Sequence, residues 1–183
     1  MKLKSLIIFL ATFAATSLYS QEYRIESKAV SFVITHPMKS VEGQCPDVTI
    51  ENFSAKREGT TITVNGPFVV RIKIQTMTTG NRNRDSNMLD TLQYPQNREI
   101  VFRAERTQIT QNTAQIQGSL SLNGHSLALT VPATVSSSGD SIAVDGEFQV
   151  KFSDFGLERP RLLLLSLEDT VTIKFHFSLG QAK

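Results

Sequence analysis

The sequence predicts an all-β fold, a closed antiparallel barrel of about eight strands with one short helix near residues 85–93. Apolar and polar residues alternate over most of the chain, as they do in strands that bury one face. Turn sequences such as Asn123-Gly124 separate the alternating runs and favour hairpins. Strands joined as hairpins satisfy their edges by closing into a barrel.

The expected strands follow this alternation in chain order. Ser138-Gly139-Asp140 and Glu58-Gly59 are expected to form turns, like Asn123-Gly124. No segment repeats at a fixed period and no low-complexity linker divides the chain, which predicts one domain. The alternating apolar series cover residues 30–36, 68–76, 100–104, 114–122, 127–135, 142–152 and 171–179.

Two segments depart from the strand pattern. Over Asp85–Gln93 the apolar residues recur at helical spacing, with Asp85 as the expected N-cap and Tyr94-Pro95 as the end of the helix. The segment from Gly156 to Leu167 is irregular and contains four consecutive leucines. Because such leucines need burial or a ligand, we interpret it as a flap over one end of the barrel.

The first 20 residues have the pattern of a secretory signal peptide. Lys2 and Lys4 precede an uncharged apolar run that ends in small residues. This run is shorter than the roughly 18–20 residues needed to span a bilayer. We therefore expect a signal peptide at 1–20 and a single domain at 21–183, periplasmic or secreted after cleavage and without stable membrane insertion.

The charge balance argues against nucleic acid as a partner. The chain has 19 basic and 17 acidic side chains, and the leader carries two of the basic ones, so the rest is neutral, with 17 of each. A nucleic-acid-binding surface needs clustered Lys and Arg on one face. We therefore expect no nucleic-acid partner.

Cys45 is the only cysteine, which excludes an intrachain disulfide. In an exported protein, an unpaired thiol is either free or joins two chains, which leaves a homodimer open. The simpler interpretation is a small apolar residue beside Pro46. The fold must then be stabilised by its core.

The inward faces are almost wholly apolar and raise the question of a cavity. An eight-stranded barrel either fills its interior or leaves room for one small ligand. Gly118 and Gly146 occupy inward positions, which indicates free space, a bend or a bulge. A ligand inside such walls must itself be apolar. The predicted wall comprises Phe32, Ile34, Val70, Ile72, Phe102, Ile116, Leu129, Phe148, Phe152 and Phe175.

The sequence does not predict an enzyme. No two histidines have a metal-binding spacing, and one cysteine cannot build a thiolate site. Nucleophile-elbow and phosphate-loop motifs are absent. We expect no catalytic residue, no metal site and no required cofactor.

Four segments of the chain form a distinctive series, namely Phe32–Met38 with Val41–Gly43, Thr79–Asn81 with Arg84-Asp85, Gly118–Gly124, and Ser153–Pro160. In this order and spacing they resemble the YceI-like family of exported isoprenoid-binding barrels. The resemblance extends from about Tyr23 to Leu179. The chain departs from the family pattern in three ways: it lacks tryptophan, it has Gln44-Cys-Pro-Asp47, and its segment before Phe68 is short. The resemblance therefore does not define the shape of one tunnel mouth.

The resemblance implies an elongated, lipocalin-like barrel whose hydrophobic tunnel holds a polyisoprenoid or another long-chain amphiphile. A bound lipid such as a polyprenyl phosphate or a quinone would then be the partner. The prediction is an exported protein that carries, stores or shields such a ligand. The alternative is an exported stress or interaction protein whose barrel is solid.

Head-group contacts are predicted from charge and position. Arg84, with the N–H groups at the start of the Asp85 helix, and Arg159 could receive an anionic or carbonyl head. Alternatively, Arg84, Asp85, Glu158 and Arg159 form ion pairs among themselves that hold loops. His36 ends its strand on the inward face and either meets a head group or caps backbone.

Overall fold

The computed structural model describes residues 20–35, 40–162 and 165–182, and their fold is almost entirely β. The predicted signal peptide therefore falls outside the described residues, apart from Ser20. Irregular turns and three short helices join the strands. The elements are β1 (Gln21–Ile34), β2 (Val41–Gln44), β3 (Val48–Glu51), β4 (Ala55–Glu58), β5 (Thr61–Val64), β6 (Phe68–Lys73), η1 (Ile74–Thr76), α1 (Arg82–Thr91), β7 (Glu99–Thr110), β8 (Thr113–Leu122), β9 (His125–Ser138), β10 (Ser141–Lys151), η2 (Phe152–Phe155), β11 (Arg161–Leu162), β12 (Leu165–Ser166) and β13 (Thr170–Gln181).

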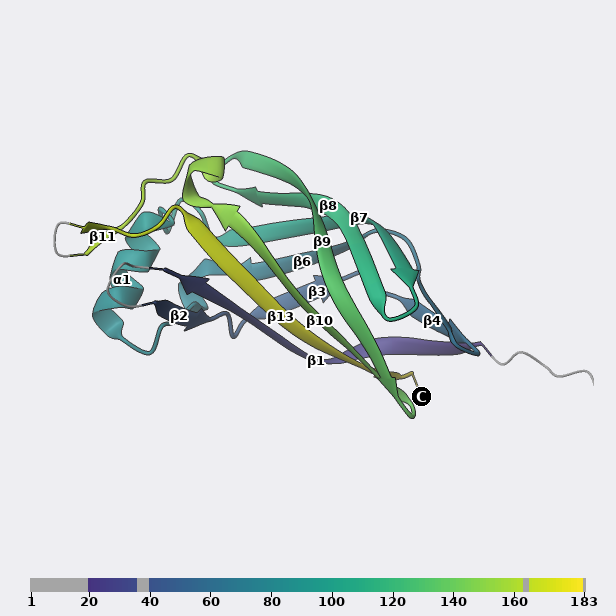
Figure 1. The fold of residues 1–183 in the computed structure, drawn as a ribbon. Coiled ribbons are helices and arrows are strands. Elements are labelled where there is room, and N and C mark those ends of the chain that lie inside the picture. Colours follow the sequence, from purple (N-terminus) through teal and green to yellow (C-terminus); the bar gives the residue numbers. More distant parts are fainter. Residues whose placement is uncertain (1–19, 36–39, 163–164, 183) are drawn as a thin grey trace, which may run out of the picture.

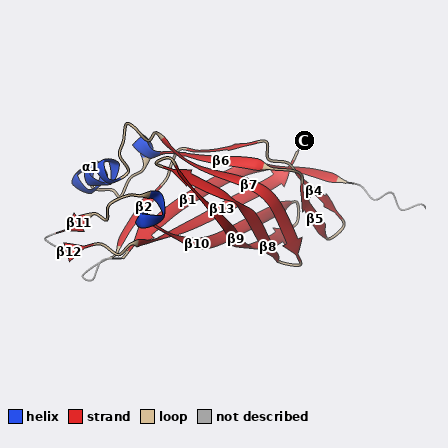
Figure 2. Ribbon diagram, turned by 90° about the horizontal axis from the view of Figure 1, so that it is seen from above, coloured by secondary structure: helices blue, strands red, loops and turns tan. Residues whose placement is uncertain are grey.

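One antiparallel sheet curls into a half-barrel, with α1 at one end (Figures 1 and 2). Its strand order is β3-β6-β7-β8-β9-β10-β13-β1-β4-β5, and β2 also pairs with β1. The prediction of a closed barrel of about eight strands is thus wrong in two respects. The end strands β3 and β5 do not pair with each other, and the sheet has more strands than expected.

The additional strands are the four-residue segments β2 to β5. Turns interrupt the chain between them, with left-handed backbone at Asn52 (φ 60°) and Gly59 (φ 61°). Four residues hold at most two inward side chains, which is too few to show an alternating pattern. The alternation in the sequence therefore predicts the long strands but not the short ones.

A β-bulge in β7 changes which of its side chains face the interior. The β7–β8 register shifts between Ala104 and Arg106. Continued alternation after the inward Ala104 would turn Arg106 inward. The extra residue of a bulge moves the alternation by one position, so Arg106 is exposed and Thr107 and Ile109 line the interior.

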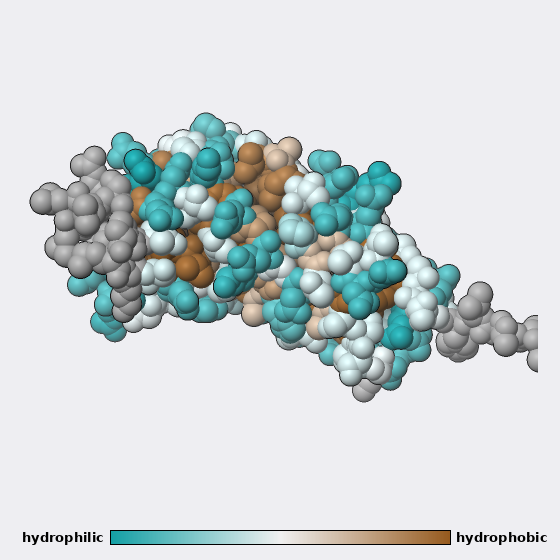
Figure 3. Space-filling view, viewed as in Figure 1, coloured by the Kyte–Doolittle hydropathy of each residue, from teal (hydrophilic) through white to brown (hydrophobic). Residues whose placement is uncertain are grey.

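β9 and β10 pair over only part of their length. The pairing runs from Ser138–Ser141 to Ala133–Gly146, and the rest of each strand diverges. We call the gap between residues 125–132 of β9 and 147–151 of β10 the seam. Leu127, Leu129 and Phe148 on its flanks are only partly buried, and hydrophobic atoms reach the surface over this part of the sheet (Figure 3).

Pro132 explains where the pairing ends. Its carbonyl oxygen lies toward β10, 2.8 Å from where a β-carbon on Gly146 would be. The N–H and C=O of a strand residue point to the same side, so the donor that proline lacks would also face β10. The next residue pair after Ala133–Gly146 therefore lacks a backbone hydrogen-bond donor on β9.

Pro132→Thr is expected to lengthen the β9–β10 ladder, because it restores this donor. One net hydrogen bond should raise amide protection along residues 147–151 by up to about tenfold. Hydrogen exchange followed by mass spectrometry measures this directly. Thr134→Val, on an exposed and already paired position, is the control. Unchanged protection in Pro132→Thr would show that another feature ends the ladder.

The helix begins earlier than the sequence indicates. α1 covers Arg82–Thr91, and its N-cap is Asn81, whose side chain accepts hydrogen bonds from the N–H groups of Asn83 and Arg84. The prediction that Asp85 is the N-cap is therefore wrong. Asp85 lies in the first turn, where a carboxylate is favourable. None of the helices in the described ranges has the length and apolar character needed to span a bilayer.

The segment predicted to be a flap contains a small hairpin. β11 and β12 pair with each other and form a sheet of their own. Figures 1 and 2 place this hairpin at the same end of the half-barrel as α1. The side chains of residues 161–166, which include the four leucines, lie outside the described part of the structure.

Candidate functional site

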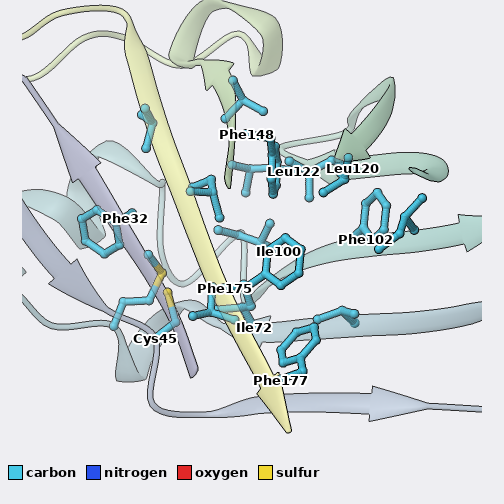
Figure 4. Close-up of a pocket in the computed structure, with 18 of the residues that line it drawn as sticks. Phe32, Cys45, Ile72, Ile100, Phe102, Leu120, Leu122, Phe148, Phe175 and Phe177 are labelled. Atoms are coloured by element: carbon cyan, nitrogen blue, oxygen red, sulfur yellow. The ribbon is translucent and has the colours of Figure 1, made fainter. Parts of the chain in front are cut away.

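The half-barrel encloses an apolar cavity of about 280 Å³. Side chains from all the long strands line it. Figure 4 labels wall residues from β1, β6, β7, β8, β10 and β13. It extends from α1 at one end to Ile142 and Leu179 at the other. Nine of the ten predicted wall residues line it, namely Phe32, Ile34, Val70, Ile72, Phe102, Ile116, Phe148, Phe152 and Phe175.

Leu129 is the predicted wall residue that does not line the cavity. It packs against the core but stays partly exposed. The reason is the separation of β9 from β10, which places Leu129 beside the seam and away from the enclosed interior. Alternation predicted the face of the strand correctly and could not predict that the neighbouring strand departs.

Other wall residues were not predicted. Val30, Leu120, Leu122, Ile142 and Leu179 are in phase with predicted wall residues, so the alternation contained the signal for them. A second group comes from irregular segments and from α1, where period-two alternation carries no information. This second group includes Cys45, Met77, Met88 and Leu92.

Three phenylalanine rings lie against glycines on the cavity wall. Phe32 pairs directly with Gly43, and Phe175 with Gly146. A β-carbon on either glycine would overlap the ring opposite, and one on Gly118 would lie 2.9 Å from Cζ of Phe102. Aromatic rings commonly cover glycines in sheets in this way.

These contacts correct one interpretation of the sequence. The space beside Gly146 and Gly118 is occupied by neighbouring side chains and backbone, so these glycines do not themselves mark an empty region. Their effect on the cavity is indirect. Because each glycine lets a ring lie flat on the wall, the ring occupies less of the interior than a ring pointing inward would.

The cavity reaches the surface at its α1 end, which we call the mouth. Arg84, Asn87 and Lys151 line the cavity and are also exposed, and no other described wall residue is exposed. Thr79 and Thr91 add further polar groups at the mouth. The rest of the described wall is apolar except for Thr107.

Hydrogen bonds to Thr79 hold Arg84 at the mouth. Its Nε donates to Thr79 Oγ1 (3.2 Å) and its Nη2 donates to the Thr79 carbonyl oxygen (3.0 Å). These contacts orient the guanidinium and use two of its five N–H groups. Arg84 thus lies at the opening of the apolar cavity, and its predicted contact with a head group stays a prediction.

Asp85 is held by hydrogen bonds within the loop that precedes α1. Its carboxylate accepts hydrogen bonds from the Thr78 hydroxyl (2.8 Å) and from the Thr79 N–H (2.7 Å) and hydroxyl (2.6 Å). Desolvation by burial opposes ionisation, but these hydrogen bonds and the charge of Arg84 together lower the pKa of Asp85 below its ordinary value. Asp85 does not line the cavity, so it holds the loop before α1.

The remaining head-group predictions have different outcomes. The N–H groups of Asn83 and Arg84 already donate to Asn81, so the start of α1 does not offer these donors to an anion. Arg159 lines a shallow polar groove beside the mouth. This groove shares Thr91, Leu157 and Pro160 with the cavity wall, so the two lie next to each other. His36 lies outside the described residues.

Cys45 is buried in the cavity wall. Desolvation raises the pKa of its thiol to about 12, so the thiol is neutral at physiological pH. It behaves as a small apolar residue, as the simpler interpretation held. Among the described residues, no group of three or more His, Cys, Asp or Glu side chains could hold a metal ion.

Solved structures with the same fold support this architecture. BcnA of Burkholderia cenocepacia matches with a TM-score of 0.67 at 21% identity, over 82% of this chain and 95% of that one. A polyisoprenoid-binding domain of Saccharophagus degradans matches with a TM-score of 0.60 at 14% identity, over 87% and 98%. The YceI protein of Campylobacter jejuni matches with a TM-score of 0.64 at 18% identity, over 82% and 90%.

No curated protein matches the chain in sequence. The YceI-like domain model matches residues 23–179, which is nearly all of the described half-barrel. The match includes the strands that build the cavity wall and α1 at the mouth. Neither the family nor these structural relatives indicate a catalytic role. The chain belongs to the YceI-like domain family.

Proposed function

We propose that this protein is an exported binding protein that holds one long-chain apolar ligand inside the half-barrel. The observation that carries the proposal is the distribution of polarity along the cavity. Polar side chains gather at the mouth, and the described wall beyond them is apolar apart from Thr107. Such a site accepts an amphiphile with its head at the mouth and its tail inside.

The apolar wall supports an apolar class of ligand. Each Å² of apolar surface removed from water contributes about 25 cal/mol before the cost of association is subtracted. A polar ligand would lose its hydrogen bonds to water in this interior, at about 1–3 kcal/mol per unpaired group. The cavity therefore favours a hydrocarbon chain and also favours ligand binding over a solid barrel that acts through its surface.

Polyisoprenoids are one candidate class, together with isoprenoid quinones and fatty-acid derivatives. One structural relative is described as a polyisoprenoid-binding domain, which supports this class by analogy. We further propose that the protein is periplasmic or secreted, on the strength of the predicted signal peptide. In that setting it would carry, store or shield a lipid that water does not dissolve.

Native mass spectrometry of the protein purified from its own host tests this function. A discrete added mass that extracts into solvent as one long-chain lipid would support the proposal and identify the ligand class. A clean apo mass, with no uptake of offered polyprenyl phosphate, quinone or fatty amide, would overturn it. The protein would then be a barrel that acts through its surface.

Arg84→Ala is expected to weaken binding only for ligands with an anionic head. Because Arg84 is exposed, its charge should contribute about 0.2–1 kcal/mol, or up to about fivefold in affinity. Parallel titrations with a polyprenyl phosphate and the matching polyprenol measure the difference. Arg82→Ala, on the same helix but away from the cavity wall, is the matched control. Equal losses for both ligands would exclude a head-group role for Arg84.

A further inference from the structure

Thr107 carries an unusual polar atom in the interior of the half-barrel. Its Oγ1 is buried and makes no hydrogen bond with any described residue, and it is the only such side-chain atom found in the described part of the chain. Thr107 also lines the apolar cavity. The other polar wall residues, such as Arg84, Asn87 and Lys151, belong to the mouth.

The fold places Thr107 on the wall through the bulge of β7. Because of the register shift between Ala104 and Arg106, Thr107 pairs with the inward-facing Ile116 of β8. The cavity-lining residues before and after it on the strand, Phe102 and Ile109, are both apolar. The Oγ1 atom itself is covered in this structure. Rotation about χ1 exchanges the hydroxyl and the methyl group of threonine, and this rotation is the step that brings the hydroxyl to a ligand in the cavity.

An isolated hydroxyl at such a position is unfavourable without a partner. A buried donor or acceptor that makes no hydrogen bond loses the free energy of its contacts with water. Most buried polar side chains in proteins have a partner, and exceptions call for a specific explanation. A bound ligand with an oxygen atom at this depth would supply the missing hydrogen bond.

The position of Thr107 defines how far that oxygen lies from the mouth. Thr107 follows Ile100, at the α1 end of β7, by seven residues. Seven residues span roughly 23 Å along a strand, or roughly 15–20 Å along a barrel whose strands are tilted. This is close to the hydrocarbon thickness of one bilayer leaflet, about 15 Å.

We infer that the bound ligand carries a hydrogen-bonding oxygen at the tail end, which the hydroxyl of Thr107 receives deep in the cavity. This inference rests on the proposed function, since it assumes a ligand whose head is at the mouth. The ligand class is then a chain of about acyl length with polar groups at both ends, such as an ω-hydroxylated fatty acid or an oxidised isoprenoid. A plain hydrocarbon tail would leave Thr107 unpaired.

The test compares ω-hydroxypalmitic acid with palmitic acid in wild type, Thr107→Val and Thr107→Ser. Valine keeps the shape of threonine without the hydroxyl, and serine keeps the hydroxyl without the methyl group. Displacement of a fluorescent fatty acid measures each affinity, and thermal melts establish that each variant is folded. Thr107→Val is expected to melt at or above the wild-type temperature, because it removes an unpaired polar atom.

Wild type is expected to bind the ω-hydroxylated acid about tenfold more tightly than palmitic acid. Thr107→Val should lose most of this preference, because only its affinity for the ω-hydroxylated acid should fall. Thr107→Ser should keep the preference. Equal binding of both acids to wild type would overturn the inference but leave the proposed function intact. A loss confined to palmitic acid in Thr107→Val would also overturn it, since the carboxyl head would then reach Thr107. Failure of every lipid to bind wild type would overturn the proposed function itself.

Discussion

Phe148→Arg is expected to abolish ligand loading in a protein that still folds. Phe148 lies on β10, lines the cavity and is drawn at its edge in Figure 4. The substitution removes an aromatic contact worth about 1.5–3 kcal/mol when fully buried. It also brings a charge and its water to a wall that must contact hydrocarbon. The combined loss should be at least about 100-fold in affinity.

The seam makes this variant tolerable for folding. Phe148 flanks the seam and is only partly buried, so the long stem of an arginine can carry its charge out to solvent. The melting temperature should therefore fall only moderately, while displacement of a fluorescent fatty acid should reveal the loss of binding. Phe148→Asn, which carries no charge, tests the same contact should the arginine variant not fold.

Gln149→Arg is the matched control for the added charge. Gln149 neighbours Phe148 on the same strand but is exposed, and its side chain donates to Thr172 Oγ1 (3.3 Å). It should load ligand like wild type. Equal loading of wild type and a folded Phe148→Arg protein would show that the ligand does not occupy this cavity.

The long strands and most of the cavity wall could be predicted from the sequence. Alternation depends only on which side chains face the interior, so it identified nine of the ten proposed wall residues correctly. It failed at Leu129 because β10 separates from β9 there, next to a proline without an N–H, and neither feature leaves a trace in the apolar pattern. The bulge that turns Thr107 inward is likewise a property of strand register.

The mouth was harder to predict than the wall. Helix starts depend on one side chain reaching two backbone N–H groups, and both Asn81 and Asp85 are suitable residue types. The hydrogen bonds of Asp85 with Thr78 and Thr79 close a loop, which spacing alone does not reveal. Arg84 does line the cavity, because that position depends only on where the helix lies, and its head-group role stays a prediction.

Gly146→Ala is expected both to destabilise the protein and to reduce the cavity. The new methyl group would overlap the ring of Phe175 and lie 2.8 Å from the carbonyl oxygen of Pro132. Overpacking of this kind costs about 1–3 kcal/mol, which lowers the melting temperature by about 2–4 °C per kcal/mol in a domain of this size. Because the sheet lies behind the ring, Phe175 can relieve the overlap only by rotating into the cavity. There it competes with the ligand.

A double-mutant cycle separates the ring from the backbone contact. Phe175→Leu removes the ring that lies on Gly146, so adding Gly146→Ala to it should cost less than in wild type, with a coupling of about 0.5–3 kcal/mol. The double variant should also recover ligand loading relative to Gly146→Ala alone. Coupling near zero would assign the destabilisation to the Pro132 carbonyl. If Gly146→Ala loaded ligand like wild type, Phe175 would have room to move without entering the ligand space. The contact between the ring and Gly146 would then not be the reason that this part of the cavity is open.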